Sequence, residues 1–414
     1  MTRKKIVVTG IGASSPLGGT APESWAALLA GESGVHTLTH DWVAEHDLPV
    51  TFAAEAKVRP EDVLERVESK RLDPSSQFAL ISAREAWADA GSPDVDPIRI
   101  GVDYSTGIGG LWTLLEAWDT LKEKGPRRVL PMTIPMLMPN AAAAAISMSI
   151  PARAFARTDV SACASSTEAI ANAYEHLQQG LADIVMAGGT ESVVHPLPIA
   201  SFAAMQALSR RNDDPTTASR PYDVSRDGFV LGEGAGTIVL ETEEHALARG
   251  ARIYAELAGG SVTSDSFHIT APDPEGAAAA RAMLAALEQA GSAITDVVHI
   301  NAHATSTPVG DIAEYRAMLR VFGDHLPSIA VSATKAATGH LLGGTGALEA
   351  IFTILAVYHR TAPPTINLTE QDPAIPLDVV TSPRPLGDGP ILALSNSFGF
   401  GGHNSVVAFR SYGS

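Results

Sequence analysis

The order of predicted strands and helices constrains the fold of this chain more than any other feature, because the same alternation of strand and helix occurs once in each half of the sequence. In the first half we expect strands over 5–12, 99–104, 155–160 and 183–188, another strand ending near 241, and helices over 23–30, 77–90 and after 168. In the second half we expect strands over 253–262, 297–301 and 329–332 and near 378, 391 and 405, and helices over 275–290, 311–322 and 345–358. Such alternation is typical of an α/β protein.

A short echo in the sequence supports an internal duplication. Ser-Thr-Glu-Ala-Ile at 166–170 resembles Ala-Leu-Glu-Ala-Ile at 347–351. With 414 residues, 45% of them hydrophobic, the chain can bury two ordinary cores. We therefore predict two similar βαβ halves, 1–251 and 252–414.

Two segments of the first half do not follow this alternation. Residues 35–75 are mixed and charged, and we expect a peripheral insertion there. Residues 126–151 are rich in Met and Pro, which indicates a lining or dimer segment rather than a regular element. Ordinary core is an equally good interpretation of the second segment.

Composition excludes several classes of protein. A single cysteine forbids an internal disulfide and suits a reducing compartment, so we expect a cytoplasmic protein. The formal net charge of −17 argues against binding to nucleic acid or anionic lipid. No apolar run approaches the roughly 18 residues of a membrane helix, so we expect no membrane span. The apolar start of the chain is soon interrupted by glycine and is interpreted as a strand, not a signal peptide.

The one cysteine is the candidate nucleophile. Cys163 follows a predicted strand and precedes a predicted helix, in a turn of small residues that leaves room for a substrate. At a helix N-terminus, unpaired N–H groups and the helix dipole favour thiolate over thiol. A lone cysteine is more often a small buried apolar residue, so the prediction depends on its partners elsewhere in the chain.

The second half supplies those partners in three blocks. His303 follows a strand, where α/β folds place their chemistry, and Lys335 and His340 share one loop before a helix that bears Glu349. A glycine-dense loop at 396–404 lies between two strands. Two histidines in strand exits, together with one cysteine at a helix start, are difficult to attribute to packing. No His-Glu-x-x-His motif and no second cysteine are present, so we expect no metal.

These motifs as a set resemble the elongating β-ketoacyl-acyl-carrier-protein synthases, the condensing enzymes of fatty acid synthesis. The resemblance covers nearly the whole chain and implies a duplicated thiolase-type fold, layered α-β-α-β-α. One departure is visible, because the family usually has glycine where this chain has Ala304, and the added methyl is expected to crowd the thioester or shift the loop. The motifs are Val8-Thr-Gly-Ile-Gly12, Ile134-Pro-Met-Leu-Met-Pro-Asn140, Ser219-Arg-Pro-Tyr-Asp223, Arg226-Asp-Gly-Phe229, the cysteine turn and the three blocks above.

The resemblance assigns a decarboxylative condensation to the chain. It implies that Cys163 accepts the acyl group and that His303 and His340 handle the malonyl thioester. The backbone N–H groups of Cys163 and Phe400 would form the oxyanion hole, and Phe400 would also be a swinging gate. Lys335 and Glu349 resemble a supporting ion pair, for which a surface salt bridge is the simpler interpretation.

The resemblance also implies contacts with substrate and partners. The substrates would be carried on the pantetheine arm of acyl carrier protein, with no cofactor, and the enzyme would be a homodimer. Ile108, in the strand exit 105–110, would limit the length of the acyl chain. An acidic carrier needs a basic patch on this acidic protein, although a solvated helix face is an equally good interpretation of such residues. The substrate-binding residues implied are Thr305, Thr307, Ile108, Phe202, Phe398 and Thr270, and the docking candidates are Arg66, Lys70, Arg71, Arg210 and Arg211.

Four related functions are the alternatives. A degradative thiolase needs a second cysteine, which this chain lacks. An initiating synthase pairs its cysteine with one histidine and an asparagine, whereas the block from Lys335 to His340 favours the elongating type. A polyketide ketosynthase shares the cysteine and both histidines, so it remains the main alternative. A non-catalytic, chain-length-setting partner subunit typically replaces the cysteine, so Cys163 argues for an enzyme.

Overall fold

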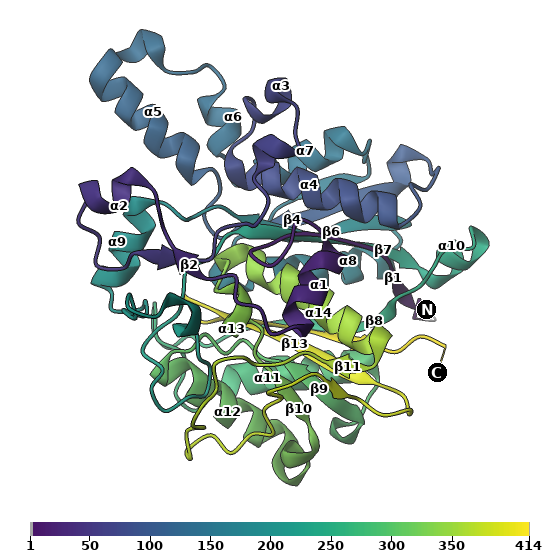
Figure 1. Ribbon diagram of the computed structural model, residues 1–414. Coiled ribbons are helices and arrows are strands. Elements are labelled where there is room, and N and C mark those ends of the chain that lie inside the picture. The colour runs from purple at the N-terminus through teal and green to yellow at the C-terminus, as the bar shows by residue number, and fades with distance from the viewer. Residues whose placement is uncertain (1–2, 414) are drawn as a thin grey trace.

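A single sheet runs through the whole molecule, and each half of the chain contributes five adjacent strands to it (Figure 1). The computed structural model describes residues 3–413. The sheet has ten strands in the order β10-β9-β13-β14-β8-β1-β7-β6-β4-β5. The strands are β1 (Ile6–Ser14), β4 (Ile100–Ser105), β5 (Phe155–Arg157), β6 (Ile184–Glu191), β7 (Gly234–Thr242), β8 (Ala255–Ser264), β9 (Val297–Asn301), β10 (Ala330–Ser332), β13 (Leu392–Gly399) and β14 (His403–Arg410).

The two halves have the same topology. The order β5-β4-β6-β7-β1 in the first half matches β10-β9-β13-β14-β8 in the second. In each half the first three strands of that order are parallel and the remaining pairings are antiparallel. A short antiparallel pairing of β1 with β8 joins the halves. The predicted duplication is therefore confirmed at the level of strand order.

Helices lie outside the two half-sheets and between them. In the first half α4 packs on the outer face against β1 and β7, and in the second half α11 packs against β8 and β14. Helices α8 and α14 contact each other and strands of both halves, so they form a central layer (Figure 1). The predicted α-β-α-β-α layering is confirmed. The long helices of the central layer and of the outer faces are α1 (Ala21–Leu29), α4 (Pro74–Asp89), α7 (Ala141–Ser149), α8 (Ser165–Gln178), α11 (Ala277–Ala290), α12 (Pro308–Phe322) and α14 (Thr345–His359).

The remaining elements are short or peripheral. Helices α5 and α6 form an arm that projects from the body of the molecule in Figure 1. The helices are α2 (Asp41–Glu45), α3 (Arg66–Ser69), α5 (Leu111–Lys124), α6 (Thr133–Leu137), α9 (Pro196–Ala204), α10 (Glu243–Ala248) and α13 (Lys335–Thr338). Two small sheets pair β2 (His36–Thr37) with β3 (Phe52–Ala53), and β11 (Thr361–Ala362) with β12 (Arg384–Pro385).

Helix α14 is the most deeply buried of the long helices in the part of the chain that the structure describes. All of its residues from Thr345 to Val357 are buried, because it packs between the two half-sheets. Within residues 3–413, one helical stretch, Leu342–His359, is long and apolar enough to cross a membrane, with mean hydropathy 1.2. This differs from the sequence expectation, but 89% of the stretch is buried inside the protein. Burial on all sides explains its apolar composition.

Three local predictions were wrong. The segment 126–151 contains two regular helices, α6 and α7, and the long helix α5 precedes it. The segment 35–75 is not merely peripheral, because its Phe52 and Val35 join the hydrophobic cluster that contains Cys163. The strand expected near 378 is absent from the described residues, where Val379 forms only an isolated bridge with Val331.

The Glu-Ala-Ile echo is out of step with the structural repeat. Helices α8 and α14 begin at Ser165 and Thr345, each directly after a 3-10 turn, η4 (Ala162–Ala164) or η8 (Leu342–Gly344). Matching these helix starts aligns Glu349 with Ala169, whereas the echo pairs Glu349 with Glu168. The duplication is thus correct, although the echo that supported it is displaced by one residue.

Candidate active site

Cys163 lies in η4, the turn directly before α8. The turn is tight, and Ala162 within it has a φ of 50°. A Cβ on Gly399 would lie 3.0 Å from the Cys163 backbone nitrogen, so the hairpin of β13 and β14 comes very close to the turn. The position predicted for the cysteine, beside a helix start, is therefore confirmed. Its side chain is only 8% exposed.

The expected preference for thiolate is wrong for the free protein. Burial raises the pKa of the Cys163 thiol to about 11, because a buried thiolate loses its hydration. The Phe400 N–H and the Lys335 charge lower this pKa, while Glu191 raises it further. The helix terminus does not overcome desolvation, so Cys163 rests as a thiol at neutral pH.

His303 follows the C-terminal end of β9, as predicted. Its backbone N–H donates to Glu314 Oε1 at 2.9 Å, and the next N–H, of Ala304, donates to Oε2 at 2.7 Å. Asn396 Nδ2 also donates to Glu314, at 3.1 Å. One buried carboxylate on α12 therefore fixes the backbone that carries His303. The Nδ1 atom of His303 is buried without a hydrogen-bond partner among the described residues.

His340 lies next to His303, with ring centroids 5.5 Å apart and planes at 84°. Its backbone N–H donates to Val230 O at 2.7 Å, and its Nδ1 lies 2.8 Å from the Thr345 hydroxyl. When that hydroxyl donates to Nδ1, the ring proton resides on Nε2, which has no partner among the described residues. Nε2 is then an N–H donor available to a ligand.

Both imidazoles are neutral at neutral pH. Burial lowers the pKa of His303 well below its usual value, and the Lys335 charge lowers it further, as would protonation of His340. Burial and the Lys335 charge act in the same direction on the pKa of His340. A neutral imidazole donates one hydrogen bond, so the pair supplies two donors without a buried positive charge.

Lys335 and Glu349 form a buried ion pair, so the simpler interpretation as a surface salt bridge is wrong. Lys335 Nζ lies 2.7 Å from Oε1 and 2.9 Å from Oε2 of Glu349, and both side chains are 1% exposed. Burial raises the pKa of Glu349, while Lys335 opposes that rise. The pair lies behind the histidines and brings a positive charge close to Cys163, His303 and His340.

One cavity of about 470 Å³ brings the predicted residues together. Its lining is mainly apolar, with the cysteine and the two histidines in its wall. Lys335 and Glu349 do not line it, and neither do the docking candidates. The predicted residues that line the cavity are Ile108, Cys163, Phe202, Thr270, His303, Thr305, Thr307, His340, Phe398 and Phe400.

The methyl group of Ala304 does not line this cavity, so the expected crowding of the thioester is wrong, whereas the alternative, a shift of the loop, stays a prediction. Ala304 is 1% exposed and belongs to the hydrophobic cluster of the second half, and it does not line the cavity. Its φ of 24° lies in the left-handed region, where a Cβ is disfavoured. The substitution therefore acts on the backbone and the core, not on the space for substrate.

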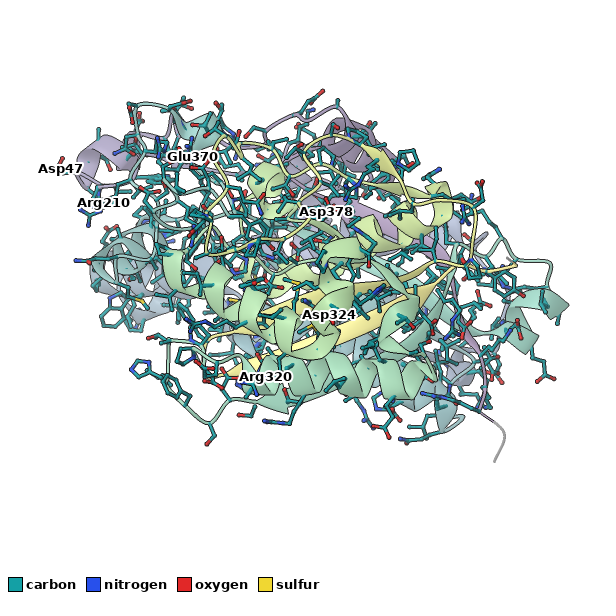
Figure 2. The ribbon with its side chains drawn as sticks, turned by 90° about the horizontal axis from the view of Figure 1, so that it is seen from below. Asp47, Arg210, Arg320, Asp324, Glu370 and Asp378 are labelled. Atoms are coloured by element: carbon teal, nitrogen blue, oxygen red, sulfur yellow. The ribbon has the colours of Figure 1, made fainter. Side chains whose placement is uncertain are left out.

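The two groups of docking candidates differ in their relation to the cavity. The Arg210 N–H donates to Asp227, which lines the cavity, and Figure 2 shows the Arg210 side chain extending outward at the edge of the molecule. The neighbouring Arg211 is partly buried and donates to Ser225 O. Arg66, Lys70 and Arg71 are exposed on and after α3, which an ion pair between Glu68 and Arg84 links to α4.

Sequence reasoning missed four residues that shape the site. Glu314 and Thr345 fix the two histidines, and Phe229 contacts the His340 ring with centroids 5.4 Å apart. Glu191, at the end of β6, is fully buried beside Cys163. A weak signal existed for Glu314, because it lies on the same helix face as Asp311 and both are buried. Phe229 belongs to the motif Arg226-Asp-Gly-Phe229, which the sequence singled out without a role for this residue, and no signal in the sequence indicates Thr345 or Glu191.

The arrangement suits chemistry on a thioester. A buried thiol, two backbone N–H groups directed at its sulfur and two neutral imidazole donors can accept an acyl group and stabilise negative charge on oxygen. Within residues 3–413, no group of three or more His, Cys, Asp or Glu side chains is arranged to hold a metal ion. The duplicated thiolase-type fold and this site define a thiol-dependent acyltransferase.

The chain belongs to the β-ketoacyl synthase family. The N-terminal domain of β-ketoacyl synthases matches residues 3–246, and the C-terminal domain matches residues 254–369. The 3-oxoacyl-[acyl-carrier-protein] synthase 2 of Mycobacterium bovis is 45% identical over 409 residues, which are 98% of this chain and 97% of that protein.

Two solved structures share the entire fold. One is a β-ketoacyl synthase from Burkholderia phymatum, with a TM-score of 0.89 and 38% identity over 99% of both chains. The other is a type II polyketide ketosynthase, bound to the hexaketide, in complex with its acyl-carrier protein. It has a TM-score of 0.91 and 32% identity, covering 99% of this chain and all of that chain.

Proposed function

We propose that this chain elongates fatty acids by condensing malonyl-acyl-carrier-protein with an acyl chain held as a thioester on Cys163. The products are 3-oxoacyl-carrier-protein, free carrier protein and CO₂. The single observation that carries this proposal is the cavity lined by Cys163, His303 and His340. The 45% identity to a 3-oxoacyl-[acyl-carrier-protein] synthase 2 supports the same reaction.

The first half-reaction transfers the acyl group to Cys163. The sulfur attacks the carbonyl carbon of the acyl thioester, and the backbone N–H groups of Cys163 and Phe400 stabilise the oxyanion. Both N–H groups interact with the sulfur of the free thiol, which supports this role. The pantetheine thiolate then leaves and takes the proton that Cys163 gives up. A high pKa of the Cys163 thiol is compatible with this exchange, because the transfer consumes one thiol, that of Cys163, and releases another, that of pantetheine.

The second half-reaction decarboxylates the malonyl thioester. Loss of CO₂ leaves an enolate, whose oxygen accepts hydrogen bonds from His303 and His340. The rings of Phe398 and Phe229 pack against these histidines, so the leaving carboxylate has an apolar environment. A carboxylate without a counter-ion in such a site is destabilised relative to neutral CO₂.

Condensation completes the cycle. The enolate carbon attacks the carbonyl of the acyl thioester, and the Cys163 sulfur leaves and recovers a proton from solvent. Lys335 and Glu349 act as positioning residues behind the histidines. Thr305 and Thr307, whose hydroxyls lie 3.0 Å apart on the cavity wall, hold the pantetheine arm.

A direct assay tests this function. The purified protein is incubated with malonyl-carrier-protein and acyl-carrier-proteins of several chain lengths, and the products are identified by mass spectrometry. The expected product is the acyl chain lengthened by two carbons with a 3-oxo group. Absence of this product for every chain length would contradict the proposal.

Synthesis of a polyketide is the second candidate function, because a polyketide ketosynthase shares this fold at a TM-score of 0.91. The same assay distinguishes the two. A polyketide enzyme would add several malonyl units without reduction between rounds, and its product mass would increase by two carbons and one keto group per round. A chain-length-setting scaffold would give no acyl adduct on Cys163.

We propose acyl carrier protein as the partner, docked on the basic candidates. Arg210, close to the cavity residue Asp227, has stronger support than Arg66 on α3. Charge reversal at Arg210 is expected to raise the Michaelis constant for carrier-bound substrate several-fold, at low salt above all, and to leave a pantetheine thioester almost unaffected. Equal effects on both substrates would refute the docking role.

We further propose a cytoplasmic homodimer. Along α5, Leu114, Trp118 and Leu121 form an exposed apolar stripe, and Ile134 on α6 is 62% exposed. Strand β5 is an edge strand of the sheet, with a free ladder edge for a second copy. Trp118→Asp together with Ile134→Asp should shift the protein from dimer to monomer in analytical ultracentrifugation. Dimers persisting in that variant would contradict this interface.

The division of the chain at 251 and 252 also remains a proposal. It lies between the two matched family domains, in the interval 247–253 that neither covers. Strand β1 also pairs with β8 across the division, so the halves share one sheet. We expect neither half to fold alone. Separate expression of 1–251 and 252–414, followed by circular dichroism, would test this expectation.

A further inference from the structure

A buried carboxylate that the proposed mechanism does not use joins two walls of the cavity. Glu191 ends strand β6 and is fully buried. Its Oε2 accepts hydrogen bonds from Gly107 N at 2.7 Å and Gly343 N at 3.0 Å. Its Oε1 accepts from the Thr106 hydroxyl at 2.8 Å and Ile108 N at 3.2 Å. Four donors from two distant segments therefore converge on one side chain.

These two segments belong to different parts of the site. Ile108 and Gly107 line the acyl side of the cavity, whereas Gly343 lies in η8, the turn that follows His340. The contact leaves no room for a side chain. A Cβ on Gly343 would lie 2.1 Å from Gly107 N and 2.8 Å from Glu191 Oε2. A Cβ on Gly107 would lie 2.7 Å from the same oxygen, so both glycines are required by the carboxylate and by each other.

Glu191 also adjoins the nucleophile. The carbonyl of Ala162, the residue before Cys163, lies 3.5 Å from the Cβ position of Gly107. The charge of Glu191 raises the pKa of the Cys163 thiol, against the opposing charge of Lys335. The other titratable groups that line the cavity are the two neutral histidines and the carboxyls of Asp227, Asp265, Asp273 and Glu314. The charges with the largest effect on the Cys163 pKa are those of Lys335 and Glu191, which oppose each other.

The partners of Glu191 favour its ionised form. Three of the four are backbone N–H groups, which donate and cannot accept, and these bonds lower the pKa of Glu191. Burial acts in the opposite direction and raises this pKa to about 7. A glutamine at this position could accept at only one of its two polar atoms. Its NH₂ group would face either Gly107 and Gly343 or Thr106 and Ile108.

We propose that Glu191 is a positioning residue of the active site, which ties the acyl wall at Ile108 to the turn after His340 and adds its negative charge to burial in keeping Cys163 protonated until a thioester arrives. The catalytic part of this inference rests on the proposed function, whereas the effect of the Glu191 charge on Cys163 is independent of that function. The inference predicts that one side chain affects both the protonation of Cys163 and the decarboxylation that depends on His340.

The test compares three variants in the full-length protein. Glu191→Gln removes the charge and two of the four hydrogen bonds. Thr106→Val keeps the charge and removes one donor to Glu191, together with the hydroxyl that accepts from Gly109 N. Glu233→Gln is the matched control, because Glu233 is another buried carboxylate whose pKa burial raises to about 7, but its side-chain partner is Ser192 and it does not bind the two segments. Melting curves establish that each variant is folded.

The first measurement is the rate of Cys163 alkylation by iodoacetamide as a function of pH. Glu191→Gln should move the midpoint to lower pH and raise the rate at pH 8 by about tenfold, the change that one pKa unit gives below the midpoint. Thr106→Val and Glu233→Gln should keep a midpoint close to that of the wild type. A shift in Thr106→Val equal to that in Glu191→Gln would indicate loosening rather than charge and would overturn the proposal.

The second measurement is CO₂ release from malonyl-carrier-protein. Glu191→Gln should lower it at least about tenfold, Thr106→Val a few-fold, and Glu233→Gln hardly at all. An unchanged midpoint in Glu191→Gln, or CO₂ release equal to that of Glu233→Gln, would overturn the proposal. If Glu191→Gln does not fold, the CO₂ release of Thr106→Val decides. A few-fold loss supports the proposal, and a rate equal to that of Glu233→Gln overturns it. Alkylation needs no substrate, so a protein with these midpoints but no condensing activity would contradict the proposed function alone.

Discussion

The two halves of this molecule have one topology but contribute different chemistry to the site. Each contains a 3-10 turn before a central helix, η4 before α8 and η8 before α14, and the first residue of each turn has positive φ, 50° at Ala162 and 45° at Leu342. The middle residue is Cys163 in one half and Gly343 in the other. The strand exit after β9 carries His303, whereas the exit after β4 carries Gly107 and Ile108.

This difference shows how a duplicated fold makes an asymmetric site. The turn η8 has no space for a side chain at the position that corresponds to Cys163, because a Cβ on Gly343 would lie 2.1 Å from Gly107 N. The first half therefore supplies the proposed nucleophile and the proposed acyl wall. The second half supplies the two histidines, and it has glycine at the position that corresponds to Cys163.

The largest effect is expected from removal of the first half's nucleophile. Cys163→Ala should abolish condensation, by at least about a thousandfold, while the fold survives because alanine fits the same buried turn. Intact mass after incubation with acyl-carrier-protein should show an adduct on the wild type only. An adduct that persists in the variant would assign the acyl acceptor elsewhere.

Removing the second half's histidines should separate the two half-reactions. His303→Ala or His340→Ala should still form the acyl adduct on Cys163 but lose decarboxylation by about a hundredfold or more, because one of two donors to the enolate oxygen is gone. CO₂ release from malonyl-carrier-protein measures this loss, with adduct formation as the internal control. Wild-type CO₂ release in either variant would give that histidine another role.

A bulky residue on the first half's strand exit should change selectivity rather than chemistry. Ile108 lines the cavity and is 42% exposed in the single chain, so Ile108→Phe is expected to shorten the acyl tunnel. Excluding four methylenes costs a long chain about 3 kcal/mol, roughly a hundredfold in specificity, while a six-carbon chain loses little. Rates with six-carbon and fourteen-carbon substrates test this. A uniform loss for both lengths would indicate overpacked core instead.

The smallest effect is expected at the corresponding exit of the second half. Ala304→Gly relieves a positive φ but removes a methyl group from the core, and each contributes about 1 kcal/mol with opposite sign. Stability should therefore change by less than about 1 kcal/mol, and chain-length preference should not change at all. Melting curves and the two acyl substrates measure this. A changed preference would mean that the methyl reaches the cavity after all.

Much of the fold followed from local patterns. Strand β9 agrees with its predicted range, and α12 and α14 begin or end within a few residues of theirs, because apolar periodicity reports which face of an element is buried. Helix α5 was not predicted, although Leu114, Trp118 and Leu121 stand at helical spacing, and the stripe they form is exposed in the single chain. The strand expected near 378 failed because an apolar run there packs as irregular chain beside β10.

The candidate site was predicted in its residues but not in its electrostatics. Cys163, His303 and His340 stood out because they are reactive side chains in small-residue turns at the ends of strands. The sequence could not indicate that burial raises the thiol pKa to about 11, or that Lys335 and Glu349 are paired at 1% exposure. Those properties depend on how much water each group loses, which no local pattern encodes.

The sequence by itself therefore determined the order of the elements, the duplication and the reactive residues, since these depend on neighbours along the chain. Tertiary structure decided which turn has space for a side chain, which carboxylate fixes the His303 backbone and which charges act on the thiol. Glu191 and Glu314 are ordinary glutamates in the sequence. They become parts of the site only because folding brings N–H groups to them and removes water. The N–H groups bound to Glu314 come from the second half itself, whereas Glu191 binds Gly107 of its own half and Gly343 of the other.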